Sequence, residues 1–225
     1  MTFSLVARCS QTGMLGAAIA SSSICVASRC PWVRSGVGAS TTQNVTDPSL
    51  GNLMLNYLEE GLNVQEAIDK IIENNKFINY RQLSLIDAKG NSASFTGSKI
   101  LGRHAVSKGV DCIATGNLLS STNVINSMTD NLKKNSNVHF IERLLLALQA
   151  GVDSGGEEGP IQSAGIKVAH ENSWPLVDLR IDWTENNPVA ELIELWNTYK
   201  PQMEDYKSRA TNPDKAPSYG VPGDL

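Results

Sequence analysis

The chain has 225 residues, a length that fits one domain. Apolar residues make up 41 % of it and charged residues 19 %, which excludes an intrinsically disordered, coiled-coil or collagen-like protein. The net charge of −4 gives no overall positive field that would attract nucleic acid or an anionic membrane. We therefore expect a soluble globular protein whose partners include neither nucleic acid nor a membrane.

Residue types and apolar stretches give expectations for the cellular compartment and for metal binding. None of the four cysteines forms a Cys-x-x-Cys pair, which favours free thiols in a reducing compartment. The N-terminus lacks the basic and continuous apolar regions of a secretion signal, and the longest apolar stretches, 17–20 and 144–148, are too short to span a bilayer. The three histidines show no metal-ligand spacing. We expect a cytoplasmic protein with no metal and no organic cofactor.

The first 46 residues predict strands. Apolar residues at every second position from Phe3 to Ala7 predict one strand, a turn signal follows at 11–13, and residues 14–20 return as the second arm of a hairpin. Small residues crowd this arm, which indicates close approach of neighbouring backbones. A further strand is predicted over 32–42, where glycines alternate with apolar residues.

Two helices are predicted next. Asp47 is a suitable N-cap with Pro48 at the first helical position, and Gly61 ends the helix. Asn63 caps the following helix with Glu66 three residues on, which is the pattern of a capping box. Each helix carries an apolar stripe along one face, so each needs a surface to pack against.

The rest of the chain repeats this grouping of strands and helices. It predicts strands over 81–87, 92–96 and 109–116, helices over about 121–133 and 138–150, paired strands over 162–169 and 176–182, and a last helix that begins at Pro188.

The order of these elements predicts the fold class. Because strands arrive in groups, antiparallel pairing is favoured over strand–helix–strand crossovers. We predict an α+β protein, a four-layer αββα sandwich with two mainly antiparallel sheets between helix layers. Residues 1–200 form its single domain, and residues 201–225 form a Pro- and Gly-rich C-terminal tail, either disordered or strapped over the domain or a partner. A homodimer or higher homo-oligomer is expected.

Thr2 is the most informative position for chemistry, because the phosphate-loop, HExxH and GxSxG motifs are all absent. A small residue after Met1 favours removal of the initiator methionine. The freed α-amine, whose pKa is about 7.7–8.0 in small peptides, could then take the proton of the hydroxyl on the same residue. Thr2 would become a nucleophile without a histidine. The alternative is that Thr2 merely begins an edge strand.

The sequence resembles a bacterial domain family of unknown function that is placed in the N-terminal-nucleophile (Ntn) hydrolase superfamily. The resemblance covers essentially the whole chain and is specific as a set of motifs. The matching segments are Thr2–Arg8, Thr12–Ser21, Pro31–Ala39, Thr42–Gln43, Arg81–Leu83, Phe95–Gly97, Gly102–His104, Gly116–Leu119, Gln162–Ala164, Asp178–Arg180 and Tyr219–Asp224.

This resemblance implies an αββα sandwich and amide-bond hydrolysis by the first residue of the mature chain. The hypothesis is an amidohydrolase that cleaves a small amide or N-acyl substrate through an acyl-enzyme on Thr2. Asn117 would stabilise the oxyanion, and Gln162 or Ser163 would orient the amine. The expected substrate-binding residues are Arg81, His104, Ser21 and Gln43.

Each candidate also has a structural alternative. Asn117 could be an ordinary cap or turn residue before the next helix, Arg81 could form a salt bridge, and Ser163 could simply pair strands. The nucleophile could instead be Ser21, Ser163 or Cys30. The rival function is a non-catalytic ligand-binding protein with an Ntn-like fold.

The chain departs from the family pattern in the segment after Gly155-Gly156. The family there has an aspartate followed by basic residues, whereas Glu157, Glu158 and Gly159 follow here. If this loop edges the site, its acidic charge sets the substrate preference apart from that of relatives.

Overall fold

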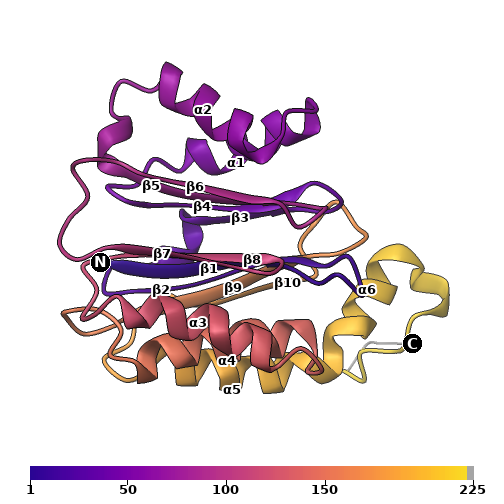
Figure 1. Cartoon of the computed structure of the whole chain (residues 1–225). Helices are drawn as coiled ribbons and strands as arrows, with labels where there is room; N and C mark the ends of the chain where they lie inside the picture. The colour runs from indigo at the N-terminus through magenta and orange to yellow at the C-terminus, as the bar shows by residue number, and fades with distance from the viewer. Residues whose placement is uncertain (222–225) are drawn as a thin grey trace.

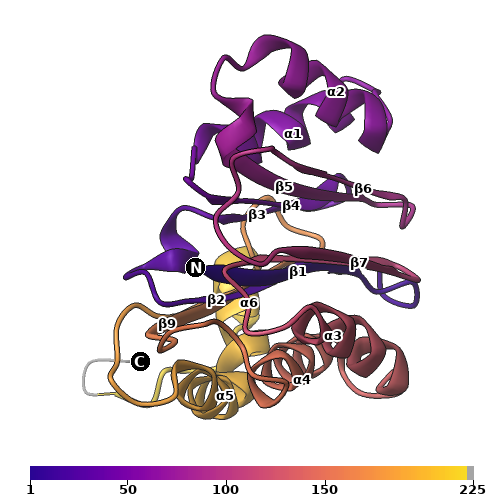
Figure 2. The ribbon, with the colours of Figure 1, turned by 60° about the vertical axis from the view of Figure 1, so that its left-hand side comes forward.

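A computed structural model describes residues 1–221, so residues 222–225, the end of the tail and of the Tyr219–Asp224 motif, lie outside the described part of the chain. Two antiparallel sheets lie face to face, and helices cover the outer face of each (Figures 1 and 2). The predicted α+β class and four-layer αββα sandwich are therefore confirmed.

The larger sheet has the strand order β10-β9-β2-β1-β8-β7, and every neighbouring pair is antiparallel. The first strand of the chain therefore lies inside the sheet, between β2 and β8. The strands are β1 (Thr2–Arg8), β2 (Leu15–Ser21), β7 (Ala105–Gly109), β8 (Cys112–Asn117), β9 (Ser163–Ala169) and β10 (Val177–Ile181).

The smaller sheet has the order β3-β4-β5-β6, and different helices cover its outer face and that of the larger sheet (Figure 1). Its strands are β3 (Pro31–Arg34), β4 (Gly38–Asn44), β5 (Arg81–Asp87) and β6 (Ser92–Thr96). The covering helices are α1 (Ser49–Glu59) and α2 (Val64–Asn74) on the smaller sheet, and α3 (Asn123–Lys134), α4 (Phe140–Asp153) and α5 (Pro188–Tyr199) on the larger.

The helix starts follow the sequence signals closely. The capping box of α2 is present, with the Asn63 side chain accepting from the N–H of Glu66 and the Glu66 carboxylate accepting from the N–H of Asn63. Helix α1 begins one residue later than predicted. The Asp47 carboxylate accepts from the N–H of Ser49, 3.2 Å away, and so satisfies one donor of the first turn.

The prediction of one strand over 32–42 was wrong, because the segment holds two strands, β3 and β4. Gly36 adopts a φ of +67°, and the N–H of Val37 donates to the Arg34 carbonyl, so the chain reverses there. The alternation of glycine and apolar residues runs on through the turn, and this hides the reversal in the sequence.

The prediction of one strand over 109–116 was also incomplete, because a turn in this segment separates two strands, β7 and β8. Asp111 adopts a φ of +54° in a tight turn, and Gly109 pairs with Cys112 across it. Strand β7 was missed because it is an edge strand with exposed Val106 and Lys108 rather than an apolar face.

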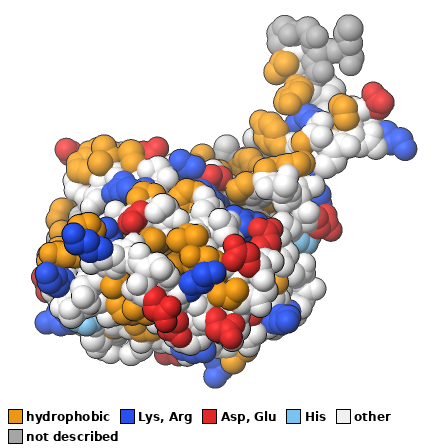
Figure 3. All heavy atoms as spheres, turned by 90° about the horizontal axis from the view of Figure 1, so that it is seen from above, with side chains coloured by type: hydrophobic (Ala, Val, Ile, Leu, Met, Phe, Trp, Pro, Cys, Tyr) orange, Lys and Arg blue, Asp and Glu red, His pale blue; other side chains and the backbone are white. Residues whose placement is uncertain are grey.

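The segment after Tyr199 contains a helix, α6 (Met203–Thr211), where the sequence showed little periodicity. Tyr199, Met203 and Tyr206 lie at helical spacing, and Met203 is buried in the core of the larger sheet's helix layer. Beyond this anchor the segment stands off the body of the molecule (Figure 3). Among residues 1–221, no helix has the combination of length and apolar character that crossing a bilayer requires.

The space between the two sheets changes character along the strands. Side chains alternate between the two faces of a strand, so every second residue of β1, β4, β5 and β8 faces the other sheet. Toward one end these residues are apolar, and toward the other they are polar, fully buried and hydrogen-bonded to one another. The apolar residues are Val6, Ala39, Ile86 and Ile113, and the polar ones are Ser4, Thr41, Gln43, Gln82, Ser84, Thr115 and Asn117.

Candidate active site

Four of the predicted site residues form one row across the larger sheet. The strand register pairs Thr2 with Asn117, and Ser21 with Ser163. The hydroxyl oxygens of Thr2 and Ser21 lie 3.2 Å apart. Residues directly opposite one another in antiparallel strands project from the same face of the sheet. We name Asn117, Thr2, Ser21 and Ser163 the Thr2 row; it lies at the polar end of the space between the sheets.

Two glutamines of the smaller sheet face this row. The Gln43 amide donates to Gln82 Oε1 over 2.8 Å, and the Asn117 amide donates to the same oxygen over 3.2 Å. The Ser4 hydroxyl donates to Gln43 Oε1 over 2.7 Å. Gln43 was predicted to bind substrate; in the structure its amide is engaged within this buried network beside Thr2.

Thr2 itself is 5 % exposed and lies against the carbonyl group of Met1. The hydroxyls of Thr2 and Ser21 both donate to that carbonyl oxygen. The Ser21 oxygen also accepts from the N–H of Ser23 over 3.0 Å. Because this contact uses an acceptor site of Ser21, the hydroxyl proton stays directed at the carbonyl. The arrangement can polarise a carbonyl group placed beside Thr2.

Glu157 is a buried carboxyl group in the same neighbourhood. Its side chain is 5 % exposed, Oε2 accepts from the N–H of Ser22 over 3.1 Å, and Oε1 has no hydrogen-bond partner among the described residues. Burial raises the pKa of the Glu157 carboxyl to about 7, while the positive charge of the N-terminal ammonium and the hydrogen bond from Ser22 act in the opposite direction.

Backbone geometry explains how Glu157 reaches this place. Gly155 and Gly156 adopt φ values of +109° and +55°, and Leu118, directly after β8, adopts +51°. The N–H of Glu158 donates to the Leu118 carbonyl over 3.0 Å, which fixes the loop beside the end of β8. Left-handed non-glycine residues store strain and cluster at functional sites. The sequence showed Glu157 only as part of an acidic loop, since burial cannot be seen in a glycine-rich segment.

Asn117 presents both groups of its side-chain amide to the site. Its amide nitrogen donates one of its two hydrogens to Gln82, so donation of the other to an oxyanion stays a prediction. Its Oδ1 is fully buried and lacks a hydrogen-bond partner in the described part of the chain. Leaving a buried acceptor unpaired costs about 1–3 kcal/mol. The Thr2 row and Glu157 therefore present two buried oxygens that lack donors.

Ser163 and Gln162 fix the backbone at and after the end of β2. The Ser163 hydroxyl donates to the Ser23 carbonyl over 2.6 Å and accepts from the N–H of Val26 over 3.3 Å, so it fastens the loop after β2. The N–H of Gln162 donates to the Ser21 carbonyl over 2.9 Å. The Gln162 contact holds the end of β2 at Ser21, and the Ser163 contacts hold the loop that follows it.

Arg81 and His104 lie at the same end of the molecule but outside the row. The Arg81 guanidinium donates to the Val45 carbonyl, just beyond β4. His104 is exposed in the loop between β6 and β7, with Nδ1 3.2 Å from the Gly102 carbonyl. The structure does not bring either side chain against Thr2.

Two of the three rival nucleophiles, Cys30 and Ser163, fit the structure less well than Thr2, whereas the third, Ser21, lies beside Thr2. Burial raises the pKa of the Cys30 thiol, which disfavours the reactive thiolate. The Ser163 hydroxyl is engaged with the loop after β2. Among the described residues, no three side chains of the metal-binding types gather in one place.

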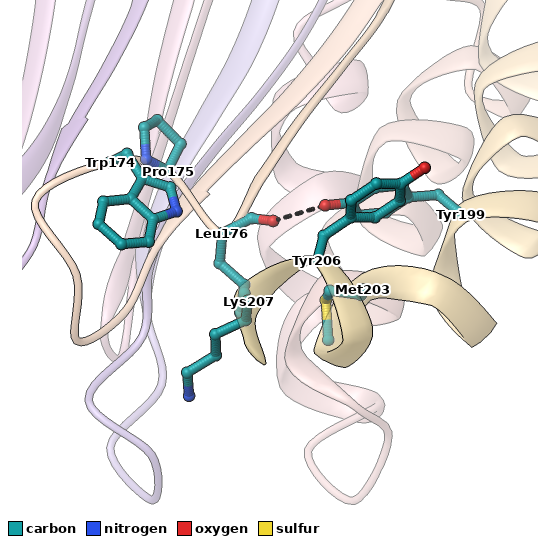
Figure 4. Close-up of a pocket in the computed structure, with 7 residues that line it drawn as sticks. All are labelled: Trp174, Pro175, Leu176, Tyr199, Met203, Tyr206 and Lys207. Carbon is teal, nitrogen blue, oxygen red and sulfur yellow. Dashed lines mark hydrogen bonds between the residues drawn. The ribbon is translucent and has the colours of Figure 1, made fainter. Parts of the chain in front are cut away.

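A hollow of about 410 Å³ lies at the opposite end of the molecule, between α5, α6 and the segment before β10 (Figure 4). The Tyr199 hydroxyl donates to the Leu176 carbonyl over 3.2 Å at its edge. It shares no residue with the Thr2 row. Its lining is Trp174, Pro175, Leu176, Tyr199, Met203, Tyr206 and Lys207.

Comparison with solved structures places this geometry among known folds. The crystal structure of a protein from Silicibacter pomeroyi is 32 % identical, with a TM-score of 0.82 over 88 % of this chain and 89 % of that one. Two Anbu (ancestral beta-subunit) structures are more distant. The one from Yersinia bercovieri is 12 % identical with a TM-score of 0.40, covering 90 % of this chain and 96 % of that one. The Gly-1 mutant from Hyphomicrobium sp. strain MC1 is 10 % identical with a TM-score of 0.43, covering 98 % and 100 %.

A search among proteins with curated functions finds no match. A model of one family, described as a family of unknown function (DUF1028), matches residues 2–192. The Silicibacter pomeroyi protein is assigned to the same family. The chain therefore belongs to the DUF1028 family, whose function is unknown.

Proposed function

We propose that this protein is an Ntn-type amidohydrolase that cleaves a small amide or N-acyl substrate through an acyl-enzyme on Thr2. The observation that carries the proposal is the buried Thr2 hydroxyl beside the Ser21 hydroxyl, with both groups donating to one carbonyl oxygen. The mechanism needs Met1 to be removed, so that the nitrogen of Thr2 becomes a free amine.

The reaction proceeds in two stages. The α-amine takes the hydroxyl proton of Thr2, and Oγ1 attacks the substrate carbonyl carbon. The Ser21 hydroxyl donates to the developing oxyanion, and the C–N bond breaks as the leaving amine takes the proton. Water then hydrolyses the ester, which releases the acid and restores the Thr2 hydroxyl.

Other groups have supporting roles in this proposal. Gln162 holds the end of β2 at Ser21, Ser163 holds the loop that follows it, and the free Asn117 oxygen can accept a hydrogen bond from the Thr2 amine. Arg81 and His104 remain predicted contacts for outlying parts of the substrate. The proposal also includes a cytoplasmic location, a homo-oligomeric state and independence from cofactors.

The test is a set of Thr2 variants assayed on a panel of small amides. We expect Thr2→Ala to lose at least about 1,000-fold in kcat/KM, and Thr2→Ser to retain measurable activity, because only the latter keeps a hydroxyl. Thr211→Ala, in the C-terminal segment, is the matched control. Intact mass should show that active protein is lighter by one methionine residue.

Two results would contradict the proposal. Unchanged turnover in Thr2→Ala would remove Thr2 as the nucleophile. Protein that retains Met1, turns over none of the amides and still binds small ligands would favour the non-catalytic ligand-binding alternative.

A further inference from the structure

We infer that the site takes α-aminoacyl amides, substrates whose acyl part carries a free ammonium group, and that Glu157 recognises that group. This inference rests on the proposed function and specifies its substrate class. It is carried by the position of Met1, which occupies the acyl side of the site, and by a buried carboxyl group with an unpaired oxygen beside it.

Met1 stands where the acyl part of a substrate would lie. Its carbonyl carbon is bonded to the nitrogen of Thr2, and its carbonyl oxygen accepts from the Thr2 hydroxyl. An acyl group on the nitrogen of a threonine and one on its hydroxyl differ by a shift across a five-membered ring, so they occupy overlapping space. Removal of Met1 therefore vacates a space of the size of an aminoacyl group, next to the nucleophile.

The contacts that hold Met1 suit an aminoacyl group at its carbonyl and at its side chain. The Ser21 hydroxyl donates to the carbonyl oxygen. The side chain lies on Gly159, where an added Cβ would come within 2.8 Å of Met1 Cε and 3.5 Å of Met1 Sδ. The space beside Gly159 therefore accepts an unbranched apolar side chain.

Glu157 supplies a group for the remaining part, the ammonium. Its loop is tied to the strand that carries Ser21, because the N–H of Ser22 donates to Oε2 over 3.1 Å. Oε1 is left buried and unpaired within the described residues. The N-terminal ammonium of Met1 is close enough to lower the pKa of Glu157 against the effect of burial.

Loss of Met1 removes the positive charge near Glu157. A buried Glu157 carboxylate then lacks a cationic partner. The Thr2 amine must be neutral to act as a base, so it cannot serve as the permanent partner of a Glu157 carboxylate. A substrate ammonium satisfies the free oxygen and neutralises the buried charge. The reaction then converts an aminoacyl amide and water into a free amino acid and an amine.

The decisive experiment compares L-methionine p-nitroanilide with N-acetyl-L-methionine p-nitroanilide on protein that has lost Met1. We expect the wild type to prefer the free-amine substrate by roughly 30-fold or more in kcat/KM, the range for loss of one partner of a buried charge pair. Glu157→Gln should abolish this preference, mainly by slowing the free-amine substrate. Glu158→Gln, a neighbouring half-exposed carboxylate, is the matched control and should keep it.

A binding measurement separates this inference from the proposed function. Isothermal titration of L-methionine into the same protein should show binding. N-acetyl-L-methionine should not bind to this protein, and L-methionine should not bind to the Glu157→Gln variant. Equal turnover of the two substrates by wild type and Glu157→Gln would overturn the inference and leave the hydrolase intact. Glu157-dependent methionine binding without turnover would keep the aminoacyl site and overturn the hydrolase. Absence of both binding and turnover would overturn both.

Discussion

Glu157 shows how a single buried residue couples the site to stability. Its folded-state pKa of about 7 lies above the ordinary value of 4.5, so the folded protein holds the proton more tightly than the unfolded chain. The contribution of Glu157 to folding is thus fully present below pH 4.5 and is lost as the pH rises through about 7. A shift of this size corresponds to about 3 kcal/mol.

This sign gives a prediction for Glu157→Gln in the absence of substrate. The variant cannot ionise, so its free energy of unfolding should match that of the wild type near pH 4.5 and exceed it by up to about 3 kcal/mol at pH 8. Urea denaturation at several pH values measures this. Parallel pH profiles for the two proteins would show that Glu157 does not titrate in this range.

The sequence predicted the members of the Thr2 row, but not which of their polar atoms are already hydrogen-bonded. Thr2 and Asn117 were chosen from position and resemblance, and the strand register brings them together. The roles of Asn117, Ser163 and Gln43 depend on which atom already has a hydrogen-bond partner. Such pairing involves residues far apart in the chain, so no local pattern reveals it.

At the scale of elements, most boundaries could be predicted because burial on one face leaves a period in the sequence. The alternation in β1 and the capping box of α2 are such local signals. The predictions at 32–42 and at β7 failed because the sequence period did not follow the strands there. A turn through Gly36 kept the alternation, and an exposed edge strand had none.

The contact between α1 and β3 gives a prediction at this scale. Gly51→Ala would stabilise an ordinary exposed helix by about 1 kcal/mol. Here a Cβ on Gly51 would lie 1.8 Å from Cδ1 of the Trp32 ring, so we expect destabilisation by about 2–3 kcal/mol instead. Chemical denaturation measures the difference. Asn52→Ala, exposed on the same helix, is the control and should change stability by no more than about 0.5 kcal/mol. A stabilised Gly51→Ala variant would show that Trp32 moves aside.

At the scale of the whole molecule, the layer arrangement could be predicted from element order, but the polar end of the space between the sheets could not. Polar residues at alternate positions normally indicate a face exposed to water. Ser4, Thr41 and Gln43 are instead fully buried, because the second sheet covers them and supplies their hydrogen-bond partners. Only the packed structure distinguishes these two cases.

The C-terminal segment gives a prediction at this scale. Tyr219 packs on Tyr206 and Arg209 of α6, whereas Met203 is buried in the core of the larger sheet's helix layer. Deletion of residues 212–225 should therefore leave the melting temperature within about 2 °C, and Met203→Ala should cost about 2 kcal/mol. Calorimetry measures both. A large drop on deletion would show that the segment stabilises the domain.

Under the proposed mechanism, Met1 must be removed before β1 is paired between β2 and β8. An aminopeptidase must draw the end of a chain into its own cleft, but folding pairs Thr2 with Asn117 of β8 and ties down the Met1 carbonyl. Trimming therefore has to happen while the ribosome is still making the first 117 residues, a window of roughly 5 to 25 seconds. Molecules that miss it stay capped, so faster synthesis should yield a larger inert fraction.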